Sequence, residues 1–155
     1  MVKAIINDFA EKCYIIANER DAYVIDPGSN YQAMKAYIEE EALELKGVLL
    51  THGHYDHISG INDLLEHFDA TIYIHKKERD FLFDPNLNLS GQMDKIFKVK
   101  EKHRVETIDE NKTFKIGKET IKVIATPGHT RGGISFHYKD YLFTGDALFR
   151  ETIGR

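Results

Sequence analysis

The sequence predicts a mixed α/β domain in which several strands come first and strands then alternate with helices. Short apolar and β-branched runs bounded by charged turns are typical of strands. Two longer segments repeat apolar residues at spacings of three and four, which is typical of amphipathic helices. The 155 residues fit one domain, residues 1–155, and 42% of them are hydrophobic, which is enough to form a core.

The expected strands nearest the N-terminus form a meander, and they cover residues 2–6, 13–17 and 22–25. The third of them ends at Asp26-Pro27-Gly28, which is a strong turn signal. Ser29 and Gln32 then match a capping box. Apolar residues recur with helical spacing up to Leu45, so a helix is expected from residue 31 to residue 45.

The middle of the chain alternates between the two kinds of element. A buried strand is expected at residues 47–50, and a second helical face covers residues 58–68. A strand at residues 71–74 and a short helix at 76–83 precede a loop over 84–92. The charged segment from Lys95 to Arg104 has no clear period and predicts no element.

The last third predicts two pairs of strands. Residues 113–116 and 120–125 flank Gly117-Lys118, which is a plausible hairpin turn. Residues 135–138 and 141–144 form the second pair.

Charge and composition limit the partners. The net charge of −4 argues against nucleic acid or an anionic membrane as the main partner. The N-terminus turns polar too soon for a signal peptide, and no apolar stretch is long enough to span a bilayer. We therefore expect a cytoplasmic protein.

The single cysteine, Cys13, excludes an intramolecular disulfide and a four-cysteine zinc site. It lies in the apolar run of residues 13–16, where a free cysteine usually behaves as a small buried hydrophobe. A catalytic thiol at Cys13 is the weaker interpretation.

The most informative stretch follows the strand at 47–50. Four side chains that can bind metal lie within six residues: His52, His54, Asp56 and His57. Neutral imidazole and carboxylate are ligands that zinc and its first-row neighbours accept. One histidine could be an accident of a polar loop or a helix cap, but this density at a strand end indicates a metal site.

Two further signals converge on the same kind of position. His129 lies in the turn after the strand that ends at Ala125, and Asp146 follows the strand that ends at Thr144. Sites in open α/β architectures form beyond the carboxyl ends of strands. Because three strand ends each carry possible ligands, we expect these ligands to form a single site.

These motifs, in this order and spacing, resemble the metallo-β-lactamase superfamily. The stretch at residues 24–28 resembles its strand-end Asp-Pro-Gly, and residues 145–155 resemble the glyoxalase II branch and its short relatives. The resemblance implies a four-layer αββα sandwich. It also implies C-terminal strands, a helix and one further histidine ligand beyond residue 155, so we expect the chain to be part of a longer protein.

The resemblance implies two divalent metal ions, zinc first, with iron or manganese as alternatives. The first ion would be held by His52, His54 and His129. The second would be held by Asp56 and His57, and Asp146 would bridge both ions. Asp56 and Asp146 would act in catalysis.

Two further positions follow from the same resemblance. Asp26 would be a buried group that steadies the histidine loop, although an aspartate that caps the turn before Pro27 explains it almost as well. Arg155 occupies a position at which glyoxalase II carries a basic residue that contacts substrate. Of the remaining histidines, His67, His75 and His103 are expected at the surface or at helix ends, and His137 inside the strand at residues 135–138.

The implied reaction is hydrolysis of a thioester, a hydroxyacyl conjugate of glutathione or of a similar thiol, by a metal-bridging hydroxide. The main alternative is a mononuclear iron persulfide dioxygenase that uses His52, His129 and Asp146. Lactone hydrolysis is a further alternative. A true β-lactamase, an RNA-cleaving nuclease and a non-catalytic binding module are weaker interpretations.

Overall fold

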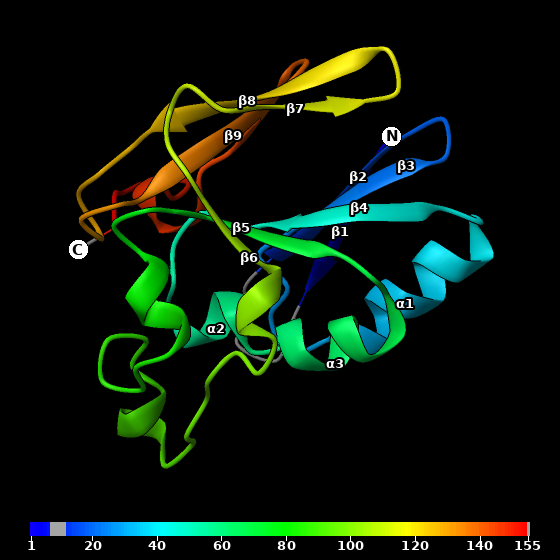
Figure 1. Ribbon diagram of the computed structural model, residues 1–155. Coiled ribbons are helices and arrows are strands. Elements are labelled where there is room, and N and C mark those ends of the chain that lie inside the picture. Colours follow the sequence, from blue (N-terminus) through cyan, green and yellow to red (C-terminus); the bar gives the residue numbers. More distant parts are fainter. Residues whose placement is uncertain (7–11, 155) are drawn as a thin grey trace.

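The structure of the protein, a computed structural model, describes residues 1–6 and 12–154. Two β-sheets face each other, and the α-helices lie against the outer side of one of them (Figure 1). This confirms the mixed α/β architecture and the two-sheet sandwich that the sequence predicts.

The larger sheet has six strands in the order β1-β2-β3-β4-β5-β6. Their bounds are β1 Val2–Ile6, β2 Lys12–Asn18, β3 Asp21–Ile25, β4 Glu44–Leu49, β5 Thr71–His75 and β6 Val105–Ile108. The first three strands pair antiparallel, and β3 to β6 pair parallel. The carboxyl ends of the parallel strands therefore meet at one edge of the sheet.

The smaller sheet is antiparallel, in the order β10-β9-β8-β7. Its strands are β7 Thr113–Ile116, β8 Glu119–Ala125, β9 Ile134–Tyr138 and β10 Tyr141–Phe143. Because β9 runs opposite to both neighbours, the ends of β8 and β10 lie at the same edge as the start of β9. Residues from two strand ends are thus brought together.

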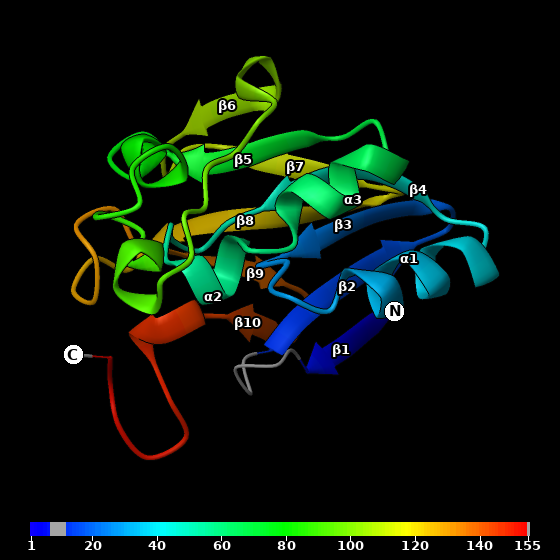
Figure 2. The same cartoon turned by 90° about the horizontal axis from the view of Figure 1, so that it is seen from below.

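The helices are short. The α-helices are α1 Tyr31–Glu40, α2 Tyr55–Ile58 and α3 Ile61–His67, and the 3-10 turns are η1 Arg79–Leu82, η2 Ser90–Met93, η3 Lys102–Arg104 and η4 Gly145–Ala147. Helices α1 and α3 lie side by side across the six-stranded sheet (Figure 2). Three of the four implied layers are thus present in the described residues. Within them, no helix has the length and apolar composition needed to cross a bilayer.

The six-stranded sheet is buried on both faces. In β3, Ala22 and Val24 pack toward the helices, whereas Tyr23 and Ile25 pack toward the other sheet. Strands that are covered on both sides need apolar residues at every position. This explains the unbroken apolar runs at residues 22–25 and 47–50.

Two expectations about the first helix are wrong. The N-cap residue is Asn30, which makes no side-chain cap hydrogen bond, and not Ser29 as the expected capping box requires. The helix also ends at Glu40, because Leu45 pairs with Ala22 of β3 as part of β4. A backbone that can pair with a neighbouring strand follows that pairing rather than the local spacing of apolar residues.

The second predicted helix, over residues 58–68, is interrupted near its start: α2 ends at Ile58, and Ser59 and Gly60 separate it from α3. The Gly60 N–H donates a hydrogen bond of 2.9 Å to the carbonyl oxygen of Pro27. A Cβ at Gly60 would collide with the carbonyl oxygen of Gly28. The close approach of the turn after β3 breaks the helix, and spacing along the chain cannot show such an approach.

Two other elements differ from expectation. The helix predicted at residues 76–83 is only the 3-10 turn η1. Strand β6 was not expected, and it begins directly after the charged segment from Lys95 to Arg104. In β6 only Ile108 is buried, so the strand carries no apolar alternation. Its parallel pairing with β5, which places Ile72 opposite Val105, defines it instead.

The contact at Gly60 can be tested by Gly60→Ala. The added methyl group must displace the backbone at Gly28, so we expect the free energy of unfolding to fall by about 1–3 kcal/mol. Urea unfolding followed by circular dichroism measures this change. Gly91→Ala is the matched control, because the nearest atom to a Cβ there is 3.4 Å away, and its effect should stay within about 0.5 kcal/mol. Equal effects of the two substitutions would contradict the contact.

Candidate metal centre

The candidate site lies where the edges of the two sheets meet. Strands β3 and β4 end side by side, with Ile25 opposite Leu49, so Asp26 lies next to Thr51. The N–H of Ile134, at the start of β9, donates a hydrogen bond of 2.9 Å to the carbonyl oxygen of Thr51. This bond joins the two sheets at the beginning of the histidine-rich loop.

Three histidines converge on one point. The Nδ1 atom of His54 lies 3.1 Å from Nε2 of His52 and 3.0 Å from Nε2 of His129. The three ligand atoms lie within 4.8 Å of one another. Tetrahedral zinc places its nitrogen ligands about 3.3 Å apart. The donor set and its spacing therefore fit a divalent metal ion.

A second group of possible ligands adjoins the first and shares His52 with it: His52, His57 and Asp146. Nε2 of His57 lies 3.2 Å from Oδ1 of Asp146 and 3.8 Å from Oδ2 of Asp56. The other oxygen of Asp146, Oδ2, lies 3.4 Å from Nε2 of His129. Asp146 thus stands between the two groups with one oxygen toward each.

The position of Asp146 depends on the glycine before it. Gly145 has a φ of 51°, and a Cβ on it would collide with the side chain of Thr51. A glycine accepts this left-handed conformation and this approach without strain. The turn after β10 can therefore press directly against the histidine loop.

Asp26 holds that loop from behind. Its carboxylate accepts hydrogen bonds of 2.8 Å from the N–H of Thr51 and 2.6 Å from the Thr51 hydroxyl. Oδ2 of Asp26 also lies 3.0 Å from Nδ1 of His57, and both side chains are buried. With Nδ1 engaged in this way, Nε2 of His57 is the nitrogen directed toward Asp146. Of the two interpretations, the structure favours the one that assigns Asp26 to steadying the loop.

Burial and neighbouring charges affect these groups in opposite ways. Burial and the adjacent histidines lower the pKa of His52 and of His54, so both rings are neutral near pH 7 and keep a lone pair for a metal. Burial also opposes the charge on His57, but Asp26, Asp146 and Asp56 outweigh it and raise the pKa of His57 well above its ordinary value. Although burial opposes its ionisation, the histidines around Asp146 lower the pKa of its carboxyl group.

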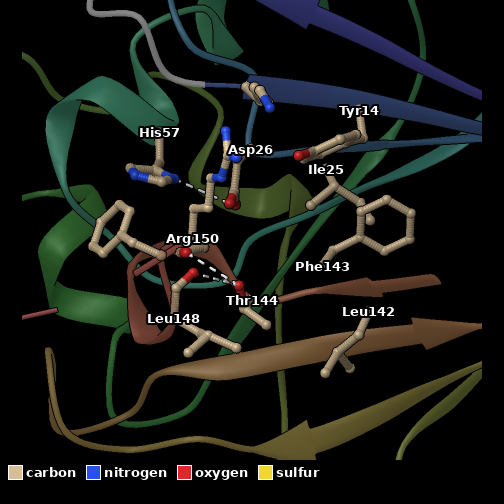
Figure 3. A pocket seen from close by; sticks show the side chains of 12 residues that line it. Tyr14, Ile25, Asp26, His57, Leu142, Phe143, Thr144, Leu148 and Arg150 are labelled. Carbon is tan, nitrogen blue, oxygen red and sulfur yellow. Dashed lines mark hydrogen bonds and ion pairs between the residues drawn. The ribbon is translucent and has the colours of Figure 1, made fainter. Parts of the chain in front are cut away.

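A pocket of about 350 Å³ opens beside the second group (Figure 3). Tyr14, Ile25 and Asp26 line it together with Leu142, Thr144 and Leu148. His57 lies at the pocket and points toward Asp26. A pocket of this volume is in the range of small-molecule sites.

The structure brings all six expected ligand residues to one place: His52, His54, Asp56, His57, His129 and Asp146. Asp56 lies at the margin, with 35% of its side chain exposed. Arg155, expected to contact substrate, lies outside the described residues.

The other histidines follow expectation with one exception. His67 and His103 are exposed, and His137 lies within β9. His75, expected at the surface or at a helix end, is buried at the end of β5, where its Nδ1 accepts a hydrogen bond from the N–H of Lys77. His75 lies opposite Ile108 of β6, and a Cβ at Gly132 would lie only 2.8 Å from its Nδ1, so segments distant in the sequence cover it. Glu78 lies in the predicted short helix at residues 76–83 and accepts hydrogen bonds from both ligand loops, and no local motif in the sequence marks it.

Comparison with known proteins agrees with this geometry. The family model described as the metallo-beta-lactamase superfamily matches residues 6–155. A probable metallo-hydrolase of Streptococcus pyogenes is 38% identical, over 97% of this chain and 67% of its own length. PksB of Bacillus subtilis, named a probable polyketide biosynthesis zinc-dependent hydrolase, is 32% identical over 99% of this chain and 62% of its own. The chain thus spans about two thirds of the length of these relatives.

Solved structures show the same fold. The BLEG-1 B3 metallo-beta-lactamase superimposes with a TM-score of 0.88 at 33% identity, over all of this chain and 76% of its own. ETHE1 from Myxococcus xanthus gives a TM-score of 0.77 at 26% identity, over all of this chain and 61% of its own. TTHA1623, solved in a di-iron-bound form, gives 0.80 at 25% identity, over all of this chain and 76% of its own.

The role of Asp26 can be measured by Asp26→Asn. The amide cannot provide the charge that pairs with His57 and places a donor against other donors, so the metal-free protein should lose about 3 kcal/mol of unfolding free energy. Urea unfolding in the presence of a chelator measures it. Asp69→Asn is the control, since Asp69 pairs with Arg104 while 96% exposed, and exposed pairs contribute at most about 1 kcal/mol. A loss from Asp26→Asn no larger than that of the control would rule out this anchoring role.

Proposed function

The chain belongs to the metallo-beta-lactamase superfamily, and we propose that it is a two-metal hydrolase that cleaves a thioester of a small thiol. The single observation that supports this best is the position of Asp146. Its two oxygens lie 3.2 Å from Nε2 of His57 and 3.4 Å from Nε2 of His129. A carboxylate in this position can give one oxygen to each of two metal ions.

The residues divide into two ligand sets. His52, His54 and His129 would hold the first ion, Asp56 and His57 would hold the second, and Asp146 lies between the two sets and could serve both. Asp56 lies farther from the others than Asp146 does, 3.8 Å from Nε2 of His57, and its partly exposed side chain faces the margin of the site. Two divalent ions bound here would supply hydroxide near neutral pH and polarise the substrate carbonyl.

The side chains have separate roles in the reaction. Asp146 fixes the distance between the two ligand sets, and Asp56 orients the attacking water from the margin of the site. Asp26 keeps His57 in one orientation through the 3.0 Å contact with its Nδ1. Cys13 is not a nucleophile, since it is buried beside Met34 and burial raises the pKa of its thiol.

The sequence of residues 145–155, the stability of a thiolate leaving group and the size of the pocket support a thioester substrate. Residues 145–155 resemble the glyoxalase II branch. A thiolate is a stable leaving group and a ligand that zinc accepts. The pocket of about 350 Å³ beside His57 can take a small acyl or thiol group. Zinc is the first choice of metal, and the name of PksB, a zinc-dependent hydrolase, supports it.

The dioxygenase alternative needs only one iron, bound by His52, His129 and Asp146. The second group of possible ligands, which adds His57, favours two ions over one. Because the chain is similar in structure to the BLEG-1 B3 metallo-beta-lactamase, a β-lactam should be assayed beside the thioester as a second substrate. Iron content and oxygen uptake separate the dioxygenase from both hydrolases.

Metal content and thioester hydrolysis test the proposal together. Plasma mass spectrometry should find about two metal ions per chain. Asp146→Ala should lose at least one of them and lower kcat/KM for a hydroxyacyl thioester by at least about 100-fold. Asp140→Ala, an exposed aspartate of the β9–β10 turn, is the matched control and should change neither. One iron per chain with oxygen uptake, or cleavage of a β-lactam but not of thioesters, would overturn the proposal.

Cys13→Ser tests the nucleophile. Because the mechanism uses no thiol, the turnover of the folded variant should match that of the parent protein. The buried hydroxyl is expected to lower stability by about 1–3 kcal/mol, so kcat must be measured below the unfolding transition. A folded variant without activity would exclude hydroxide as the nucleophile.

A further inference from the structure

A buried carboxylate outside the ligand sets contacts both ligand loops. Glu78 follows strand β5, and its side chain is fully buried, with 0% exposure. Neither group of possible metal ligands includes it. Burial of a carboxylate is costly unless its oxygens accept hydrogen bonds. The partners of those oxygens therefore indicate what the residue does.

Each oxygen of Glu78 accepts from a different loop. The N–H of Gly132 donates a hydrogen bond of 2.8 Å to Oε1, and the N–H of Gly53 donates a longer bond of 3.4 Å to Oε2. Gly53 lies between His52 and His54, and Gly132 follows three residues after His129. One carboxylate thus spans the two loops that carry the first ligand set.

Close packing supports the same interpretation independently. A Cβ at Gly132 would lie 2.8 Å from Cγ of Glu78 and 2.8 Å from Nδ1 of His75, and a Cβ at Gly53 would collide with Phe81. Both loops therefore press their bare backbone against residues 75–81. Arg131 adds a third contact, because its Nε donates a hydrogen bond of 3.0 Å to the carbonyl oxygen of Lys77.

Burial raises the pKa of Glu78, and the hydrogen bonds from Gly132 and Gly53 oppose this effect. Buried polar groups that are completely satisfied make a local structure more rigid. The 3.0 Å separation of the ring nitrogens of His54 and His129 depends on how their two loops are held.

We propose that Glu78 is a positioning residue that holds the loop of His54 and the loop of His129 at the distance needed by the first metal ion. It acts through the backbone of Gly53 and Gly132, and not as a ligand. The inference rests on the proposed two-metal function, because it assumes that these histidines bind metal. Residues that orient ligands affect metal affinity by about 10- to 100-fold.

The test uses Co²⁺ as the probe, with the purified protein, Glu78→Gln and Glu78→Ala. Glutamine keeps the volume and one acceptor but places an amide N–H₂ against a backbone N–H. We expect Glu78→Gln to weaken the binding of one Co²⁺ by about 10-fold and Glu78→Ala by about 100-fold, measured by competition with a chelator. The visible absorption bands of bound Co²⁺ should also change, because they report the ligand geometry.

Ser90→Ala is the matched control. Ser90 is also completely buried, and its Oγ accepts a hydrogen bond of 3.1 Å from the N–H of Phe97, but its bonds reach neither ligand loop. The control should lower the melting temperature and leave the Co²⁺ affinity and spectrum unchanged. A purely structural role for Glu78 predicts the same behaviour for the Glu78 variants.

The possible outcomes separate this inference from the proposed function. Folded Glu78 variants with the affinity and spectrum of the parent protein would overturn the inference. So would a Glu78→Gln chain that does not fold, since the residue would then support the whole fold. If the parent protein binds two Co²⁺ but cleaves no thioester, while the Glu78 variants lose affinity, the proposed substrate fails and the inference stands.

Discussion

The carboxylate of Asp26 links the backbone of the fold to the chemistry of the site. It accepts hydrogen bonds from the N–H and the hydroxyl of Thr51 and contacts Nδ1 of His57. It can do so because β3 and β4 are parallel and end together, with Ile25 opposite Leu49. The conformation of the histidine loop, and the nitrogen that His57 directs toward Asp146, both follow from this pairing.

The site also depends on backbone segments that approach each other more closely than side chains would allow. Gly145 lies against Thr51, Gly53 against Phe81, and Gly132 against Glu78. The hydrogen bond from Ile134 to Thr51 then fixes the edge of one sheet to the edge of the other. Ligands from three strand ends can therefore meet within a few ångströms, because the segments that carry them are in contact.

The close packing of imidazoles and carboxylates in the site shifts their pKa values. His52 and His54 are partly or fully desolvated beside other imidazoles, which lowers their pKa, whereas the carboxylates around His57 raise its pKa. Groups so close together with opposite shifts are typical of functional sites, where stability is given up for chemistry. A bound cation would offset the charge of Asp146 and Asp56 and would use the lone pairs that burial keeps free of protons.

The sequence by itself determined the residues of the candidate centre and most of the strands. The ligand types are dense around His52 to His57, and strand periodicity is a local property, so both can be recognised without a structure. The tertiary structure decided the break of the helix at Gly60, the burial of His75 and the position of Glu78. It also favours one of the two interpretations of Asp26, because Thr51 and His57 both contact its carboxylate. These features depend on contacts between residues distant along the chain, 25 positions apart for Thr51 and Asp26 and 54 for Gly132 and Glu78. A local pattern carries no information about such contacts, because only the parallel pairing of the strands and the meeting of the two sheets create them.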